Sequence, residues 1–256
     1  HRSMECRGKL NMKAALWHQK SLHELAELDA EISRIEHRTK NLAEQRALEE
    51  AQTAHREAND RLAALQLALA DIDAEVAKFE TEIDSVRQRE DRDRSLLDGG
   101  TIDAKQLTEL QHELDTLQRR QASLEDSLLE VMERREELAA EQDRALEEID
   151  QLQTTRSDAE RVCDEARTQL AQQKHQSLSH RSDLVAGIDE ALVALYERQR
   201  ARGGVGAGVL QGRRCGACRI EIDKGELARI AAASDDEVLR CPECSAILLR
   251  VKGFQA

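Results

Sequence analysis

Four of the six cysteines in this 256-residue chain stand in two pairs with the spacing of metal ligands. The first pair belongs to "CGAC" at 215–218 and the second to "CPEC" at 241–244, with residues 219–240 between them. Two cysteines three positions apart can direct both sulfurs at one ion from a single tight turn, and two such turns complete a tetrahedron. We call residues 215–218 the first knuckle and 241–244 the second. The spacing predicts one Zn²⁺ bound by Cys215, Cys218, Cys241 and Cys244.

Other interpretations of the pairs fit less well. No secretory segment is recognised, which disfavours disulfides. A thioredoxin-like redox motif needs a single CxxC before a helix of an α/β fold, and this chain lacks that context. A rubredoxin-like iron site is packed with aromatic residues, whereas the only aromatic residue near the pairs is Phe254. No histidine follows His180, so all four ligands are expected to be cysteine. Four protein ligands leave no open position, which indicates a structural metal.

The segment that must position the knuckles is residues 201–256. Five glycines between 203 and 212 end the preceding helix and open this small domain. Val205, Val209 and Leu210 predict a short strand, and "SAILLRV" predicts a closing strand. Between the knuckles, "RIEI" and "EVLR" show the alternation typical of strands, whereas "GELARIAAA" has a helical pattern. A ribbon this small has too little apolar core of its own, so zinc is expected to supply much of its stability.

The preceding residues are expected to form long helices, because the chain is 35% charged, only 2% aromatic and has one proline. Apolar residues from Leu107 to Leu170 recur at spacings of three and four in one heptad register, which is typical of a coiled coil. Polar residues also occupy this stripe, namely Gln121, Arg135, Gln142 and Arg156. Stripes at 48–86 and 25–42 are out of phase with each other, which predicts a kink or local unwinding near residues 42–48.

Gly99 and Gly100 interrupt the helical pattern. Each costs a helix interior about 1 kcal/mol relative to alanine, so we expect the chain to turn at 98–103. The predicted fold is mainly α: an antiparallel coiled-coil hairpin over 12–200, with a short terminal helix at about 183–200, followed by the zinc ribbon. An intermolecular coiled coil with a glycine hinge is the alternative, but the matching arms favour a hairpin. Residues 1–11 are expected to be a cloning remnant and flexible N-terminus, with the native start at Met4 or Met12.

The chain resembles the bacterial C4-type zinc-ribbon coiled-coil proteins. The resemblance is carried by both knuckles and by "LDAEISRIEHR" at 28–38, "GGTIDAKQLTELQHELDTLQRRQASLED" at 99–126 and "YERQR" at 196–200. It implies a non-enzymatic adaptor that binds nucleic acid or components of the transcription machinery. The family usually has glycine after the last cysteine, where this chain has Ser245, so the second knuckle's turn is expected to differ.

The charge distribution favours the ribbon as the contact surface. The net charge is −13, yet from Arg198 onward 11 basic side chains face seven acidic ones. RNA or DNA is therefore expected to contact the ribbon, and an ordinary solvated surface is the alternative. The candidate contacts flank the knuckles: Arg213, Arg214, Arg219, Arg240, Arg250 and Lys252.

Two other functions fit the sequence. The protein could regulate RNA polymerase through an acidic hairpin tip, or act as a protein–protein scaffold; the tip residues would be Asp91, Asp93, Asp98 and Asp103. We find no nucleophile with a base and no phosphate loop, so we expect neither an enzyme nor a small-molecule substrate. No run of 18 apolar residues occurs, so we expect no membrane span, and since no signal peptide is recognised we expect a cytoplasmic protein.

Overall fold

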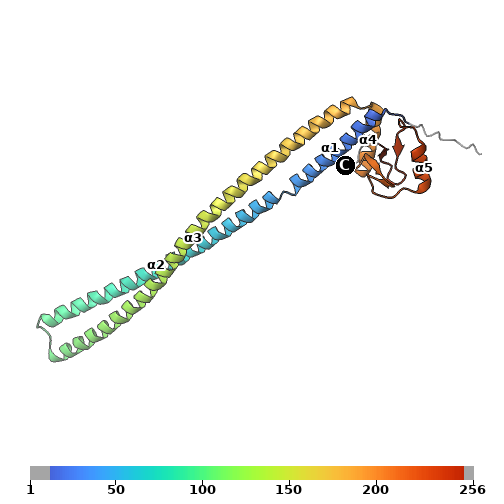
Figure 1. The fold of residues 1–256 in the computed structure, drawn as a ribbon. Coiled ribbons are helices and arrows are strands. Elements are labelled where there is room, and N and C mark those ends of the chain that lie inside the picture. Colours follow the sequence, from blue (N-terminus) through green and yellow to red (C-terminus); the bar gives the residue numbers. More distant parts are fainter. Residues whose placement is uncertain (1–11, 251–256) are drawn as a thin grey trace, which may run out of the picture. The chain divides into compact units, whose positions relative to one another are not determined.

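The structure is a computed structural model that describes residues 12–250. Four helices precede the ribbon: α1 (Leu16–Lys40), α2 (Ala43–Asp98), α3 (Ala104–Gly187) and α4 (Glu190–Gly203). The ribbon contains α5 (Lys224–Ala232) and four short strands, β1 (Ala207–Gln211), β2 (Arg214–Cys215), β3 (Leu239–Arg240) and β4 (Ile247–Leu249). Figure 1 shows α2 and α3 running side by side from a short connection, which confirms the predicted hairpin. Among the described residues, no helix has both the length and the apolarity needed to span a membrane.

The described chain divides into two compact units. One is contiguous, Ala43–Cys163, and holds the connected ends of α2 and α3. The other combines the chain up to Leu42 with the chain from Asp164 onward, so it holds α1, the last part of α3, α4 and the ribbon. We call them the hairpin unit and the ribbon unit.

In the hairpin unit, the heptad stripes face each other as expected from their period. Ile72, Ile83 and Val86 of α2 are buried, as are Leu117 and Val131 of α3. Ion pairs beside the stripes hold the register, because Arg61 and Arg87 of α2 lie 2.9 and 2.8 Å from carboxylates of α3. Their partners are Glu148 and Glu125.

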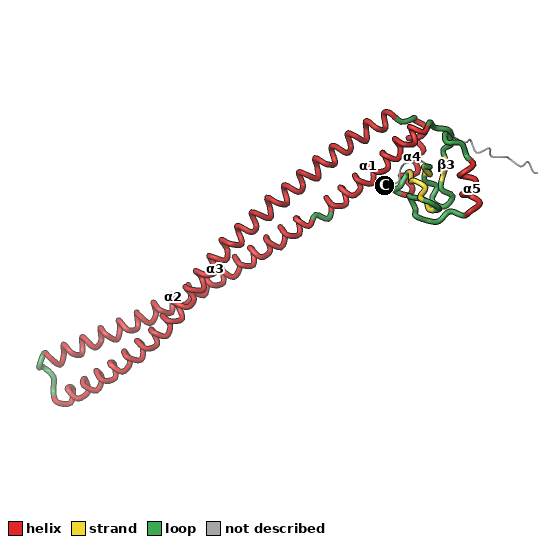
Figure 2. Tube along the Cα trace, in the orientation of Figure 1, coloured by secondary structure: helices red, strands yellow, loops and turns green. Residues whose placement is uncertain are grey.

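The connection between α2 and α3 has a defined geometry (Figure 2, green). Gly100 has φ 65°, a left-handed conformation that glycine adopts without steric cost. Asp103 then caps α3 reciprocally: its carboxylate accepts from the backbone N–H of Gln106 at 2.8 Å, and the Gln106 side chain accepts from the N–H of Asp103 at 3.1 Å. This capping box fixes where α3 begins.

The predicted kink is a complete break between α1 and α2. α1 ends at Lys40, Asn41 has φ −121° and ψ 50°, and α2 begins at Ala43. Leu42 between them is buried. Because the helix is interrupted here, α1 buries its stripe within the ribbon unit and α2 buries its own stripe within the hairpin unit. α3 continues without interruption from Ala104 to Gly187.

In the ribbon unit, the strands form one sheet in the order β2-β1-β4-β3. β1 and β4 are parallel, and the other neighbours are antiparallel. The backbone N–H of Val238 also donates to Met12, so the start of the described chain lies along the β3 side. "RIEI" forms only an isolated bridge between Glu221 and Arg214, where the sequence pattern predicted a strand.

Both faces of β4 are buried, and this decides how the ribbon folds. Ile247 and Leu249 pack in one core with Leu22 and Leu25 of α1, Leu192 and Tyr196 of α4, Ile188 of the connection between α3 and α4, and the partly buried Val185 of α3. Leu248 points to the other side, into a core with Cys215, Cys241, Ile222 and Ile230. The ribbon therefore shares its apolar core with α1, α3 and α4.

The terminal helix begins later than the predicted 183–200. Gly187 ends α3, and Asp189 caps α4 by accepting from the N–H of Leu192 at 3.0 Å. Gly204 ends α4 in a left-handed conformation, φ 78°.

Candidate metal centre

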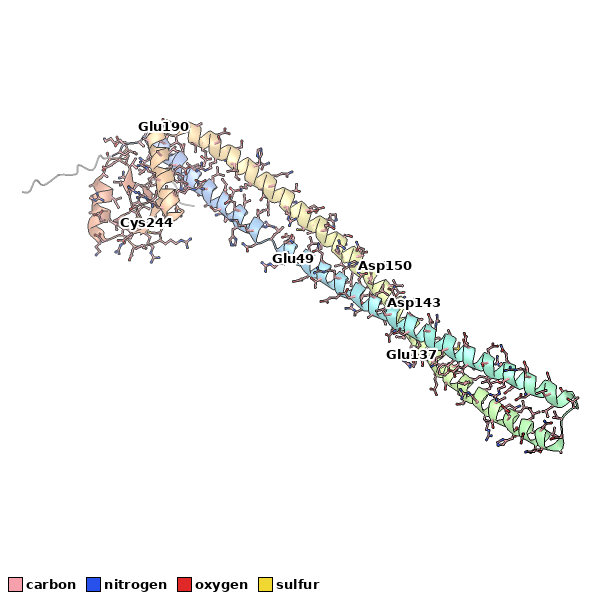
Figure 3. All side chains as sticks on the ribbon, turned by 180° about the vertical axis from the view of Figure 1, so that it is seen from behind. Glu49, Glu137, Asp143, Asp150, Glu190 and Cys244 are labelled. Atoms are coloured by element: carbon pink, nitrogen blue, oxygen red, sulfur yellow. The ribbon has the colours of Figure 1, made fainter. Side chains whose placement is uncertain are left out.

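The four cysteines of the two knuckles converge on one point. Their Sγ atoms all lie within 4.8 Å of one another, and Cys215–Cys244 and Cys218–Cys241 are each separated by 3.9 Å. A tetrahedral zinc site with bonds of about 2.3 Å requires sulfur–sulfur distances of about 3.8 Å. The sulfur geometry therefore fits a Zn²⁺ ion. Figure 3 labels Cys244 among the side chains of the ribbon.

The two knuckles share one hydrogen-bond pattern. The first cysteine of each accepts at its carbonyl from the residue four positions on: Arg219 N–H donates to Cys215 at 2.8 Å and Ser245 N–H to Cys241 at 2.9 Å. The same cysteines donate their own N–H to the residue five positions on, Ile220 and Ala246. Two equal turns thus present two sulfurs each from opposite sides of the site.

The residue after each knuckle has a left-handed backbone, with φ 64° at Arg219 and 65° at Ser245. The expectation that Ser245 alters the second turn is therefore wrong, because the glycine-type conformation is kept with a serine. A left-handed conformation costs a non-glycine residue about 1–2 kcal/mol. The knuckle hydrogen bonds and the shared core must offset this cost at both positions.

The electrostatics of the thiols differ within the site. Burial raises the pKa of Cys215, and burial raises the pKa of Cys244 to about 12. Burial acts to raise the pKa of Cys241, but hydrogen bonds with the backbone N–H groups of Cys244 and Glu243 and with the thiols of Cys215 and Cys244 together outweigh it, so this pKa is lowered. Without a cation, the four thiols cannot all ionise together, whereas a dication favours four thiolates.

The first knuckle is seated on β1 through close backbone contacts. Gly216 N–H donates to Val209 at 2.9 Å. A Cβ added to Gly216 would lie 2.5 Å from the Val209 carbonyl oxygen, and one added to Gly208 would lie 2.4 Å from the Ala217 nitrogen. Neither position has room for a side chain, so the glycines are required for the approach of strand and knuckle.

The second knuckle is attached to α4 through Gln199, which is only 5% exposed. Its Nε2 donates to the carbonyl oxygen of Cys244 at 2.7 Å, and its Oε1 accepts from Arg240 at 3.2 Å. Arg240 also donates to the Ser245 carbonyl at 2.9 Å. The knuckle's second half is thus held by a helix that lies outside the ribbon.

One turn earlier, Tyr196 connects α4 to α1. Its hydroxyl donates to the buried carboxylate of Asp29 at 2.6 Å. Arg181 of α3 donates to the same carboxylate at 2.6 Å and also pairs with Glu197. "YERQR" contributed only to the family resemblance, and these roles were not predicted from it. The available signal was polar residues at i, i+3 and i+4 on a helix just before the ribbon.

The predicted nucleic-acid contacts separate into four groups, of which Arg250 is the last. Arg213, Arg214 and Arg219 are exposed around the first knuckle, with a 3.8 Å ion pair between Arg213 and Glu221. Arg240 is exposed but engaged by Gln199 and Ser245, as described above. Lys252 lies outside the described residues.

Arg250 has a structural task instead. Its guanidinium donates to the carbonyls of Ile230 and Ala233 at 2.9 Å each, and to Ser234 at 2.6 Å. These carbonyls lie at the C-terminal end of α5, where helical acceptors have no intrahelical partner. Arg250 therefore caps α5, and we leave it out of the candidate surface.

Comparison with solved structures supports this architecture. A protein structure from Mycobacterium smegmatis is 63% identical, covers 94% of this chain and 100% of its own, and superposes with a TM-score of 0.82. The structure of CT398 from Chlamydia trachomatis is 17% identical over 91% of this chain and 98% of its own, with a TM-score of 0.65, which shows the shared fold.

Sequence comparison assigns the family. A Mycobacterium tuberculosis protein is 58% identical over 95% of this chain and 100% of its own length, and a Mycobacterium leprae protein is 49% identical over 90% and 99%. The family model of the CT398-like coiled coil hairpin domain matches residues 25–204, and that of the C4-type zinc ribbon domain matches 214–248. Neither is an enzyme family. The chain is thus a zinc-binding coiled-coil protein and belongs to the CT398-like coiled-coil hairpin family, with a C4-type zinc ribbon at its C-terminal end.

Proposed function

We propose that the protein is a non-enzymatic adaptor in which one structural Zn²⁺, held by the four knuckle cysteines, orders a basic surface that binds RNA or DNA. The surface consists of Arg213, Arg214 and Arg219, and we call it the knuckle surface. All three side chains are exposed, and the only ion pair that they form within residues 12–250, Arg213 with Glu221, is long at 3.8 Å. Three exposed guanidinium groups therefore lie close together around the metal site, where they can contact phosphate groups, and this is the main support for the proposal.

The helices of the hairpin unit are poor candidates for phosphate contact. Figure 3 shows acidic side chains spread along α2 and α3, including Glu49, Glu137, Asp143 and Asp150. All four are exposed. Like charges repel the phosphate backbone, so binding should concentrate at the knuckle surface.

The experiment uses the full chain, because the ribbon shares its core with the helices. Fluorescently labelled single-stranded RNA, single-stranded DNA and duplex DNA are titrated at several salt concentrations against wild type and Arg213→Ala/Arg214→Ala. Two lost phosphate contacts should make the slope of log K against log salt shallower by about 1.8 on duplex DNA and about 1.4 on single strands. Affinity at low salt should fall at the same time.

The matched control is Arg134→Ala/Arg144→Ala, which removes the same charge from two exposed positions of α3. It should leave the salt slope unchanged. Equal losses in the two double variants would indicate a diffuse charge effect, and absence of binding at low salt would favour a protein scaffold. Either result would contradict the proposal.

A further inference from the structure

The two knuckles are attached to the rest of the ribbon unit in different ways. Backbone contacts with β1 hold the first knuckle. In the second knuckle, the hydrogen bonds of the turn itself begin or end at Cys241, and neither of them reaches the carbonyl of Cys244. Gln199 of α4 supplies that contact, because its Nε2 donates to the Cys244 carbonyl at 2.7 Å. One of the four metal ligands is thus held by a side chain from outside the ribbon.

Both ends of the Gln199 amide are used. Only 5% of Gln199 is exposed, and its Oε1 accepts from Arg240 at 3.2 Å. Arg240 in turn donates to the carbonyl of Ser245 at 2.9 Å. The backbone carbonyls of Cys244 and of the residue after it are therefore both fixed. Because only one side-chain torsion separates a cysteine sulfur from its backbone, this also limits where the Sγ of Cys244 can lie.

α4 is a firm support for this contact. One turn before Gln199, the hydroxyl of Tyr196 donates to the buried carboxylate of Asp29 in α1 at 2.6 Å. Arg200, next to Gln199, lies 3.4 Å from the same carboxylate. Leu192 of the same helix is completely buried in the core shared with α1. Contacts with α1 thus hold α4 in place without any contribution from the cysteines.

We propose that Gln199 is a positioning residue for the zinc ligand Cys244, and that α4 thereby helps to set the affinity of the ribbon for zinc. The inference rests on zinc as the bound metal, as in the proposed function, and does not depend on nucleic-acid binding. A hydrogen-bond partner just outside the ligands of a metal holds them in the binding geometry, and its loss typically lowers metal affinity by roughly 10- to 100-fold. By thermodynamic linkage, bound zinc strengthens the attachment of the second knuckle to α4 by the same factor.

Gln199→Met in the full chain tests the proposal, because methionine has a similar length and volume but cannot donate to Cys244. The probe is Zn²⁺ itself, competed from the protein by a chelator of known zinc affinity. The variant should bind zinc about tenfold more weakly, or weaker still. Gln172→Met is the matched control, since Gln172 is an exposed residue of α3 in the same unit, and it should leave zinc affinity unchanged.

Two further variants separate positioning from general stability. Tyr196→Phe removes a hydrogen bond from the same helix without touching the knuckle, so it should lower the melting temperature and leave zinc affinity unchanged. Arg240→Ala changes an exposed residue that holds the Ser245 carbonyl, and it should weaken zinc binding in the same direction as Gln199→Met.

Cobalt in place of zinc reports on the geometry of the four sulfurs through its visible absorption bands. These bands should change in Gln199→Met and stay as in wild type in Tyr196→Phe. The proposal is overturned if Gln199→Met binds zinc as tightly as wild type, if Tyr196→Phe weakens zinc binding equally, or if the cobalt bands of Gln199→Met are those of wild type. A wild-type chain that binds no zinc would overturn the metal assignment as well.

Discussion

Replacing Tyr196 by phenylalanine tests whether the polar cluster between α1, α3 and α4 stabilises the ribbon unit. Tyr196 and Asp29 are both buried, and the hydroxyl donates to the carboxylate at 2.6 Å. Phenylalanine keeps the ring and removes only this donor, so one acceptor site of a buried charge is left unpaired. Hydrogen bonds to charged groups contribute about 1.5–3 kcal/mol. Arg181 and Arg200 remain near Asp29, so we expect a loss of about 2 kcal/mol in the free energy of unfolding.

Urea unfolding of the zinc-loaded full chain, followed by tryptophan fluorescence, measures this loss. Trp17 is the only tryptophan and belongs to the ribbon unit, so it reports on the unit that is perturbed. Thr116→Val is the control. It removes an exposed hydroxyl that donates to His112 within α3 of the hairpin unit, and it should change stability by less than about 0.5 kcal/mol.

A double-mutant cycle with Asp29→Asn isolates the pair itself. A coupling of about 1 kcal/mol or more is expected, because the two groups are in direct contact. The reasoning would be refuted if Tyr196→Phe cost less than about 0.5 kcal/mol, or if its effect simply added to that of Asp29→Asn.

Four further measurements follow from the site. Metal analysis should find one zinc per chain. Cys241→Ser should lower this zinc content, whereas Cys163→Ser should not, because Cys163 is buried in the hairpin unit. A zinc content well below one per wild-type chain would contradict the assignment. Ser245→Gly should stabilise the ribbon unit by about 1 kcal/mol, because Ser245 has a left-handed backbone with φ 65° that glycine adopts more easily. Ser182→Gly, inside α3, should destabilise the same unit. Destabilisation by Ser245→Gly would contradict the reasoning. Gly206→Ala should cost about 1–3 kcal/mol, because its Cβ would lie 2.5 Å from the Tyr196 ring; Gly187→Ala, with open space around it, is the control. Burial, reinforced by Asp29, raises the pKa of Tyr196, which is the only tyrosine of the chain. The neutral hydroxyl of Tyr196 therefore contributes fully to stability below the unfolded-state pKa of about 10, and this contribution is lost as pH rises above that value. Absorbance at 295 nm should therefore show tyrosine ionising only together with alkaline unfolding, and ionisation of the folded chain near pH 10 would contradict this.

The sequence was most informative where structure depends on local period and spacing. The stripe from Leu107 to Leu170 predicted α3 because a heptad pattern needs only the chain itself and one facing helix. The two CxxC pairs predicted that four sulfurs would meet, because each pair needs only one tight turn. The glycine interruption at 99–100 predicted the connection for the same local reason.

Sequence reasoning failed where a residue's role depends on distant partners. Arg250 was predicted to contact nucleic acid because it is basic and near the second knuckle, but its guanidinium donates to the carbonyls of Ile230 in α5 and of Ala233 just after it. Gln199 carried no signal of its contact with Cys244, which lies 45 positions further along the chain. Nor could the register of α2 reveal that the buried Oε1 of Glu90 would have no hydrogen-bond partner among the described residues, because that depends on which α3 side chains reach it.

The position of β4 has a consequence for the order in which the molecule is made. This strand is the last element of the described chain, yet it lies inside the sheet and packs on α1, the first helix. The contiguous residues Ala43–Cys163 can pair soon after they leave the ribosome. α1, although synthesised before them, keeps Leu22 and Leu25 exposed until Ile188, Leu192 and Tyr196 have been synthesised, and their core is complete only when β4 follows. During translation, the first helix of the described chain is thus covered later than the hairpin unit, and its apolar side chains stay exposed to aggregation in the interval.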